Sequence, residues 1–214
     1  MIKIENTRVY NIKDALRGMR NPKNSWHKND TTTVCDITDG HIVETHIGPN
    51  DTALAQTLIK AGTEHRKFLR QIFVSADFTM PNYLSNEFDT CKLCTTRNSC
   101  SVQHKGSSRD FVPSDFTFDD MSNPDIDIVV GLVNKYRQKF IESGDYSDFR
   151  TMRQFMGMNY NYKFTWTGNY EVLLNIYRQR KNHKLKEWHE ICDWIKCLPG
   201  MNVFLTEEFD EKNS

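Results

Sequence analysis

Three cysteines and one histidine lie close together near the middle of the chain, with the spacing Cys-x-x-Cys-x5-Cys-x3-His. They are Cys91, Cys94, Cys100 and His104. Structural Zn²⁺ sites use thiolate and imidazole ligands in a tetrahedral arrangement, so this spacing is compatible with a Cys3His zinc site. The second half of the motif supplies one cysteine and one histidine among polar residues, which is a weaker pattern than two Cys-x-x-Cys pairs. Unligated thiols remain the alternative interpretation.

Basic side chains are concentrated in the segment 176–186, although the whole chain carries 28 Lys and Arg against 28 Asp and Glu. The segment contains Arg178, Arg180, Lys181, His183, Lys184 and Lys186. Guanidinium groups bind phosphate through paired, charge-assisted hydrogen bonds, so this cluster is a candidate anion site. A solvated helix surface is the alternative.

Arg153 lies in the segment 149–167, which is otherwise rich in apolar and aromatic residues. Arginine is seldom buried without a partner, so this position favours a contact with a ligand or with another subunit.

Several familiar site types are missing from the sequence. His41, His46 and His65 show no metal-ligand spacing with a carboxylate or a second histidine. No Gly-rich phosphate loop, His-Glu-x-x-His helix or nucleophile elbow occurs. The corresponding enzyme classes are therefore excluded.

Composition limits the remaining classes. A formal net charge of zero argues against non-specific nucleic-acid binding, which requires an excess of Lys and Arg. No apolar run reaches the roughly 20 residues that span a bilayer, and the first residues lack a signal-peptide core. We therefore expect a cytoplasmic protein with reduced cysteines and neither membrane nor nucleic-acid partners.

The elements that must position these residues follow from hydrophobic periodicity. The pattern predicts an edge strand over residues 1–10 and a helix over 12–19, then a loop over 20–49 with a strand at 41–46. A helix begins near residue 50, capped by Asn50 or Asp51, and is interrupted at Gly62. The alternation of apolar residues over 71–79 predicts a strand that is buried on one face.

The sequence pattern predicts mainly helices in the second half of the chain. An acidic loop is expected over residues 110–127, followed by helices over 128–142, 169–180 and 185–197. The apolar stripe of the first of these helices is assigned to Val129, Leu132, Val133, Tyr136 and Phe140. With 214 residues, the chain is expected to form one α+β domain, with a mixed or antiparallel sheet flanked by helices. Residues 1–49 are expected to be irregular and residues 200–214 to form a flexible tail.

The stretch from Arg153 to Arg180 resembles a segment of the flavin-dependent thymidylate synthases. That family has an Arg before a Leu-Pro turn, then Phe-Trp-Thr-x-Asn, then Leu-x-Asn-Phe-x-x-Leu-Arg. This sequence has Arg153, then Phe-Thr-Trp-Thr-Gly-Asn ending at Asn169, then Leu-Leu-Asn ending at Asn175, and finally Arg180. The match contains no gap, and a weaker similarity extends it to roughly residues 50–195.

The resemblance implies an activity and its cofactors. The fold would be the α+β domain of that family, assembled as a homotetramer with FAD and nucleotide at subunit interfaces. The reaction would be the reductive methylation of dUMP to dTMP, with methylenetetrahydrofolate as carbon donor and NADPH as reductant of the flavin. Because the flavin carries the hydride and one-carbon chemistry, no thiol nucleophile is required.

The resemblance also implies roles for individual residues. Arg153 matches an Arg that binds dUMP from a neighbouring subunit. Arg180 matches the Arg at the pyrimidine, where its charge favours negative charge developing on the ring. The other substrate-binding positions are Glu87, Asn98, Ser101 and Gln103. The flavin-binding positions are His65, Lys92, Asn169, Asn175 and His183.

The signature loop of the family is only partly present. Its pattern, Arg-His-Arg-x-x-Ser-x-Asn-Glu-x-Ser-x-Arg-Tyr, falls on residues 90–104, where Asn98 and Ser101 keep the Asn-x-x-Ser spacing and Lys92 stands for an Arg. Glu87 stands where the family has a substrate-contacting Gln. Three hypotheses follow: a thymidylate synthase-like enzyme, a non-catalytic relative that binds pyrimidine nucleotides, and a zinc-stabilised interaction module.

Overall fold

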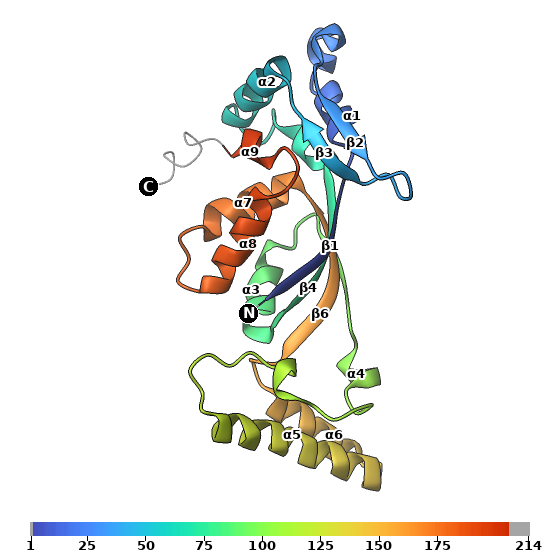
Figure 1. Cartoon of the computed structure of the whole chain (residues 1–214), viewed down its shortest axis with the longest axis vertical. Coiled ribbons are helices and arrows are strands. Elements are labelled where there is room, and N and C mark those ends of the chain that lie inside the picture. The colour runs from blue at the N-terminus through green and yellow to red at the C-terminus, as the bar shows by residue number, and fades with distance from the viewer. Residues whose placement is uncertain (1, 206–214) are drawn as a thin grey trace. The chain divides into compact units, whose positions relative to one another are not determined.

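The computed structural model describes residues 2–205, apart from the side chain of His104. Among these residues, four strands form a sheet in the order β1-β4-β6-β5, and β2 and β3 form a separate antiparallel hairpin (Figure 1). The strands are β1 (Lys3–Tyr10), β2 (Thr32–Cys35), β3 (Ile42–His46), β4 (Phe73–Pro81), β5 (Thr96–Ser99) and β6 (Asn161–Asn169). The helices are α1 (Ile12–Gly18), α2 (Pro49–Lys60), α3 (Asn82–Phe88), α4 (Val102–Lys105), α5 (Asn123–Ser143), α6 (Tyr146–Met156), α7 (Tyr170–Arg180), α8 (Lys186–Lys196) and α9 (Met201–Phe204). Short 3-10 helices cover Asn21–Lys23, Trp26–Lys28, Lys67–Gln71, Asp89–Cys91 and Pro113–Asp115.

The chain divides into two compact units. Unit 1 comprises Met1–Lys3, Asp77–Thr90 and Arg97–Thr165, and unit 2 comprises Ile4–Ala76, Cys91–Thr96 and Trp166–Ser214. Strands β1, β4, β5 and β6 each contribute residues to both units. The predicted α+β class is confirmed, whereas a single domain over residues 1–214 stays a prediction.

Strand β4 shows the predicted alternation. Ile72, Val74, Ala76, Phe78 and Met80 are all buried, whereas the residues between them are exposed or half-buried. Successive side chains of a strand point to opposite faces, so this pattern places one face of β4 in the core. The predicted strand and its alternation are therefore confirmed, but the strand covers Phe73–Pro81 instead of residues 71–79.

The core of unit 1 is largely aromatic. Phe78, Phe88 and Phe164 form a three-ring cluster with centroid separations of 5.3, 5.6 and 6.3 Å. A second cluster lies where α5 and α6 pack side by side (Figure 1), and its buried members are Val102, Phe111, Phe116, Val130, Val133, Phe149, Met152 and Met156. The second cluster thus holds α6 and α4, which carry two of the predicted site residues, because Val102, Met152 and Met156 belong to it.

Two details of this cluster correct the sequence prediction. Helix α5 begins at Asn123, five residues before the predicted start at residue 128, and it buries Val130, which the predicted stripe omitted. Val129 and Leu132 are only half-buried. Helix α6 was not predicted, although Phe149, Met152 and Met156 recur at helical spacing and are buried.

The core of unit 2 reaches almost to the end of the described chain. Phe204 of α9 is fully buried and packs edge-on against Phe68 and Tyr170, at centroid separations of 5.9 and 6.0 Å. The Tyr170 hydroxyl donates to the Pro199 carbonyl at 2.8 Å. The predicted flexible tail from residue 200 is therefore wrong for Met201–Phe204, and residues 206–214 lie outside the described part of the chain.

Helix α2 is capped by a residue distant in the sequence. The Asp30 carboxylate accepts hydrogen bonds from the backbone N–H groups of Asn50 and Asp51, both at 2.9 Å. Gly48, the residue just before the helix, has no room for a side chain, because a Cβ there would lie 2.3 Å from Asp30 Cγ. The prediction that Asn50 or Asp51 caps this helix is wrong, since four N–H groups at a helix start need acceptors and Asp30 supplies two of them.

The N-terminal part is more regular than predicted. The strand over 1–10 is observed as the edge strand β1, and the helix over 12–19 as α1. The expected loop over 20–49 contains β3, as predicted, and also β2, which was not predicted. The description of residues 1–49 as irregular is therefore wrong.

No helix among residues 2–205 combines the length and the apolar character that crossing a bilayer requires.

Candidate functional site

The predicted site residues fall into both units. Unit 1 contains Glu87, Asn98, Ser101, Gln103 and Arg153. Unit 2 contains His65, Lys92, Asn169, Asn175, Arg180 and His183.

In unit 1 the structure brings Arg153 and Gln103 together. Arg153 Nη1 donates to Gln103 Oε1 at 3.5 Å, and both side chains are exposed. Helix α6 presents Arg153 outward because Met152 and Met156 on its other face are buried in the unit 1 core. Within residues 2–205 Arg153 forms no ion pair, so its positive charge is balanced only by the Gln103 amide dipole. An exposed guanidinium in this state can bind an anion.

A cavity of about 180 Å³ lies beside α4. Its lining includes Cys100, Ser101, Lys105, Arg109, Phe111 and Tyr160, so Ser101 is the predicted substrate-binding residue that reaches it. Ligand pockets for whole drug-sized molecules usually measure about 300–1,000 Å³. The cavity therefore suits one chemical group of a ligand, such as a phosphate, better than an entire nucleotide.

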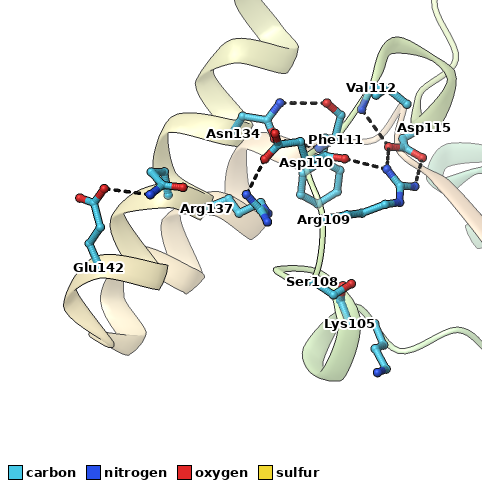
Figure 2. Close-up of polar contacts among 11 residues, drawn as sticks. Lys105, Ser108, Arg109, Asp110, Phe111, Val112, Asp115, Asn134, Arg137 and Glu142 are labelled. Atoms are coloured by element: carbon cyan, nitrogen blue, oxygen red, sulfur yellow. Dashed lines mark hydrogen bonds and ion pairs between the residues drawn. The ribbon is translucent and has the colours of Figure 1, made fainter.

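The polar groups around this cavity are held in place by their neighbours (Figure 2). Arg109 forms a bidentate pair with Asp115 at 2.8 and 2.6 Å. Burial acts to raise the pKa of Asp115, but the hydrogen bonds from Arg109 and the Val112 N–H lower it below its usual value. Asn134 of α5 binds the Phe111 backbone through two hydrogen bonds: its Oδ1 accepts from the Phe111 N–H at 2.8 Å, and its Nδ2 donates to the Phe111 carbonyl at 2.9 Å. Because Asp115 offsets the Arg109 charge, Lys105 supplies the net positive charge of the lining.

Tyr160 contributes a neutral hydrogen-bond donor. Burial, followed by the nearby Asp115 charge, raises the pKa of the Tyr160 phenol above its usual value. The phenol therefore stays protonated at neutral pH. Together with Ser101 and Lys105, it gives the cavity a donor-rich lining that is suited to an anionic group.

Residues 90–104, which correspond to the signature loop, contain one arginine, Arg97. Its side chain makes contacts that stabilise the fold. Arg97 on β5 donates to Ser85 Oγ at 2.8 Å, pairs with Asp89 at 2.8 Å and lies 5.0 Å above the Phe164 ring. Ser85 is buried. Sequence reasoning missed this role, which links β5 to α3. Asn98, the next residue, is exposed.

Glu87 and Lys92 each accept hydrogen bonds through the backbone carbonyl. The Glu87 carbonyl accepts from Thr90 Oγ1 at 2.7 Å, and the Lys92 carbonyl accepts from Thr95. The Lys92 side chain is exposed, whereas Glu87 is half-buried. Lys92 is therefore accessible to a ligand from solvent.

In unit 2, Asn169 has a structural function at the start of α7. Its Oδ1 accepts from the Val172 N–H at 3.1 Å, which is the usual N-cap bond. The predicted helix over 169–180 is confirmed with this cap. Asn169 is buried, so only a small part of its amide is accessible to a ligand.

Asn175 belongs to a buried polar network that sequence reasoning did not foresee. Arg66 Nε lies 2.9 and 3.1 Å from the two Glu171 carboxylate oxygens, and Arg66 Nη2 donates to Asn175 Oδ1 at 3.4 Å. Arg66 and Glu171 are both buried, whereas His65 is exposed. The available signal was Glu171 among apolar residues at the start of α7.

Arg180 and His183 meet on one aromatic ring. The Arg180 guanidinium carbon lies 4.8 Å from the Trp188 ring centroid, within the range of a cation–π contact. His183 contacts the same ring edge-on at 6.2 Å. His183 Nδ1 accepts a hydrogen bond from the Leu185 N–H at 3.2 Å. Trp188 thus anchors both residues at the junction of α7 and α8.

The structure leaves the zinc hypothesis untested. Cys91 and Cys94 lie in unit 2 and Cys100 lies in unit 1, while the His104 side chain is not described. Among the described side chains, one group has three possible ligand atoms within 4.8 Å of one another, formed by Asp36, Asp39 and His41. That group lies at the turn of the β2-β3 hairpin, where Asp39 already pairs with Arg8 and His41. Zinc analysis of the purified protein decides whether the cysteines hold a metal.

Comparisons with known proteins support the fold. No protein-family model matches the sequence, and no curated protein matches it. Among the solved structures that share the fold are two of flavin-dependent thymidylate synthase from Helicobacter pylori, also called thymidylate synthase X, with FAD and dUMP. The first has a TM-score of 0.71 at 15% identity and is aligned over 98% of this chain and 99% of its own. The second has a TM-score of 0.71 at 16% identity over 96% and 98%.

The chain therefore has the fold of a flavin-dependent thymidylate synthase over nearly its whole length. The resemblance of residues 153–180, stated from the sequence, concerns the same family.

Proposed function

We propose that the protein is a thymidylate synthase-like flavoenzyme that methylates dUMP to dTMP, with FAD, NADPH and methylenetetrahydrofolate. The observation that carries this proposal is the fold shared over 98% of the chain with an enzyme solved with FAD and dUMP. The ungapped motif from Arg153 to Arg180 supports it independently. A homotetramer and a cytoplasmic location belong to the same proposal.

In unit 1 we assign the nucleotide phosphate to Arg153, Gln103 and Ser101. Arg153 has no ion-pair partner among the described residues, and its bond to Gln103 fixes the direction of the guanidinium. Lys105 adds positive charge to the cavity that Ser101 lines. This donor set fits a phosphate monoester, which requires several charged or strongly polar donors.

In unit 2 we assign the flavin to His65, Asn175 and Asn169, and the pyrimidine to Arg180. When bound, FAD supplies the hydride and one-carbon chemistry. The exposed His65 ring offers a flat surface, and the Asn175 amide offers donors. Arg180, held by Trp188, brings a fixed positive charge that favours negative charge on the uracil ring.

The non-catalytic relative is the second candidate, because one observation favours it. Arg97, which is the only arginine of residues 90–104, is held by Ser85 and Asp89. A loop without further arginines offers fewer phosphate contacts than the family signature. Such a protein would bind dUMP without turnover.

The test is reconstitution of the purified chain with FAD, followed by a dUMP titration. We expect a yellow protein with the absorption bands of oxidised flavin, and a melting temperature that rises with dUMP concentration, as ligand linkage requires. A nucleotide-induced rise without flavin binding supports the second candidate. A colourless protein with an unchanged melting temperature rejects both.

A further inference from the structure

Three residues of unit 2, Arg66, Glu171 and Asn175, form a chain of polar contacts. Glu171 binds Arg66 through both carboxylate oxygens, with Arg66 Nη2 also 2.9 Å from Oε1. Arg66 in turn donates to Asn175 Oδ1 at 3.4 Å. The Arg66 and Glu171 side chains are 6% and 9% exposed, so they rest against protein and not against bulk water.

The chemistry of arginine fixes the direction of the Asn175 amide. A guanidinium group carries five N–H donors and no acceptor, so the Asn175 atom that faces it must be the oxygen. The amide NH2 group is then turned away from Arg66. Asn175 lies one turn after Glu171 on the same face of α7. The network therefore joins this helix to the segment that contains His65 and Arg66.

We infer that Arg66 and Glu171 are positioning residues that hold the Asn175 amide with its NH2 group toward the ligand. The ligand must then present a hydrogen-bond acceptor to Asn175, and a flavin ring carbonyl or unprotonated ring nitrogen meets this requirement. The inference rests on the proposed function for the identity of the ligand, whereas the amide orientation rests on the contacts alone. Arg66 directly follows His65, the neighbouring flavin position of the proposed function.

Two Asn175 variants separate orientation from ligand binding. In Asn175→Asp the acceptor for Arg66 is retained and the NH2 donors are lost. In Asn175→Leu both are lost. We expect Asn175→Asp to melt within a few degrees of the parent and Asn175→Leu to melt clearly lower, with FAD affinity reduced at least about tenfold in both. If Asn175→Leu and the parent melt at the same temperature, the inferred orientation of the Asn175 amide is wrong. This conclusion does not depend on whether the protein binds FAD.

A double variant tests the positioning residues themselves. Replacing a buried ion pair with apolar residues of similar size is often neutral for stability. We therefore expect Arg66→Met with Glu171→Met to fold, and to bind FAD at least about tenfold more weakly because the amide is free to turn. A folded double variant with the FAD affinity of the parent overturns the inference and leaves the proposed function intact.

The two failures are distinguishable. If the parent protein binds no FAD while the melting order of the Asn175 variants is as expected, the proposed function fails and the amide orientation stands. If the double variant does not fold, Asn175→Asp still decides the matter, because a parent-like FAD affinity in that variant contradicts a role for the NH2 donors.

Discussion

Arg153 of α6 and Gln103 of α4 are joined by a hydrogen bond of 3.5 Å, although they lie 50 residues apart in the chain. The bond holds an exposed guanidinium beside the segment that carries Ser101. A positive charge kept in one place without a carboxylate partner costs little in stability and is available to an anion. We therefore expect changes in this pair to affect binding more than folding.

Replacing Arg153 with Ala should weaken dUMP binding without destabilising the protein. Hydrogen bonds to charged groups contribute about 1.5–3 kcal/mol, which corresponds to roughly 10- to 100-fold in Kd. Surface substitutions usually change stability by about 0.5 kcal/mol or less. Isothermal titration calorimetry with dUMP measures the first effect and thermal melting the second.

Arg150→Ala is the matched control for this prediction. Arg150 is also an exposed arginine of α6, one turn before Arg153. We expect its dUMP affinity to equal that of the parent. Equal losses in the two variants would mean that the overall charge of α6 acts, and that Arg153 has no specific role.

The Arg20–Asp51 pair should matter strongly for folding. Asp51 is fully buried and Arg20 is 4% exposed, with Arg20 Nε donating to Asp51 Oδ1 at 2.7 Å. Arg20 Nη2 lies 2.6 Å from the same oxygen but outside hydrogen-bond geometry. Removing one partner of a buried pair leaves an uncompensated charge and costs about 3–5 kcal/mol. We expect Asp51→Ala to lower the free energy of unfolding by that amount in urea denaturation.

Asp14→Ala serves as the comparison, because Asp14 forms an exposed pair with Arg17 at 3.8 Å. Exposed pairs are worth about 0–1 kcal/mol. Equal decreases in the free energy of unfolding for the two variants would contradict the importance of the buried Arg20–Asp51 pair.

Acid should weaken the attachment of α2. Burial acts to raise the pKa of the Asp30 carboxyl, but the N–H donors of Asn50 and Asp51 and the Arg20 charge lower it below its usual value. A carboxyl whose pKa is lower in the folded state stabilises the protein above its unfolded pKa of about 3.9. This contribution is lost as the pH falls through the folded pKa.

Asp30→Asn should therefore remove part of the acid dependence of unfolding. The measurement is the free energy of unfolding of the parent and the variant between neutral pH and acid. Parallel profiles for the two proteins would contradict the capping role of Asp30.

The C-terminal helix α9 should be part of the folding core of unit 2. Phe204 is fully buried, and Phe→Ala substitutions at such sites cost about 3–5 kcal/mol. We expect this loss for Phe204→Ala, and less than about 0.5 kcal/mol for the exposed neighbour Asn202→Ala. Similar unfolding midpoints for both variants would show that α9 is dispensable.

Sequence reasoning succeeded where one local pattern determines the structure. The alternation in β4 and the helix over residues 169–180 depend on residues close in the chain, and both predictions are confirmed. The cap of α2 could not be found this way, because Asp30 lies 20 residues before Asn50. Strand β2 was missed because three of its four residues are exposed and the fourth is half-buried, so no burial pattern marks it.

The same limit applies to the candidate site. The family resemblance suggested Gln103 and Asn175, and Arg153 was also singled out by its apolar surroundings, but the partners of all three are set by tertiary structure. Glu171 and Arg66 are 105 residues apart and bind each other only because both are buried beside α7. Local signals were present but overlooked in helix α6 and in strand β6, where buried and exposed residues alternate.

The most direct test of the central claim is a turnover assay of the FAD-loaded protein with dUMP, methylenetetrahydrofolate and NADPH. We expect flavin-dependent NADPH oxidation and formation of dTMP, both abolished in Arg180→Ala. A protein that binds FAD and dUMP and yet forms no dTMP would contradict the central claim.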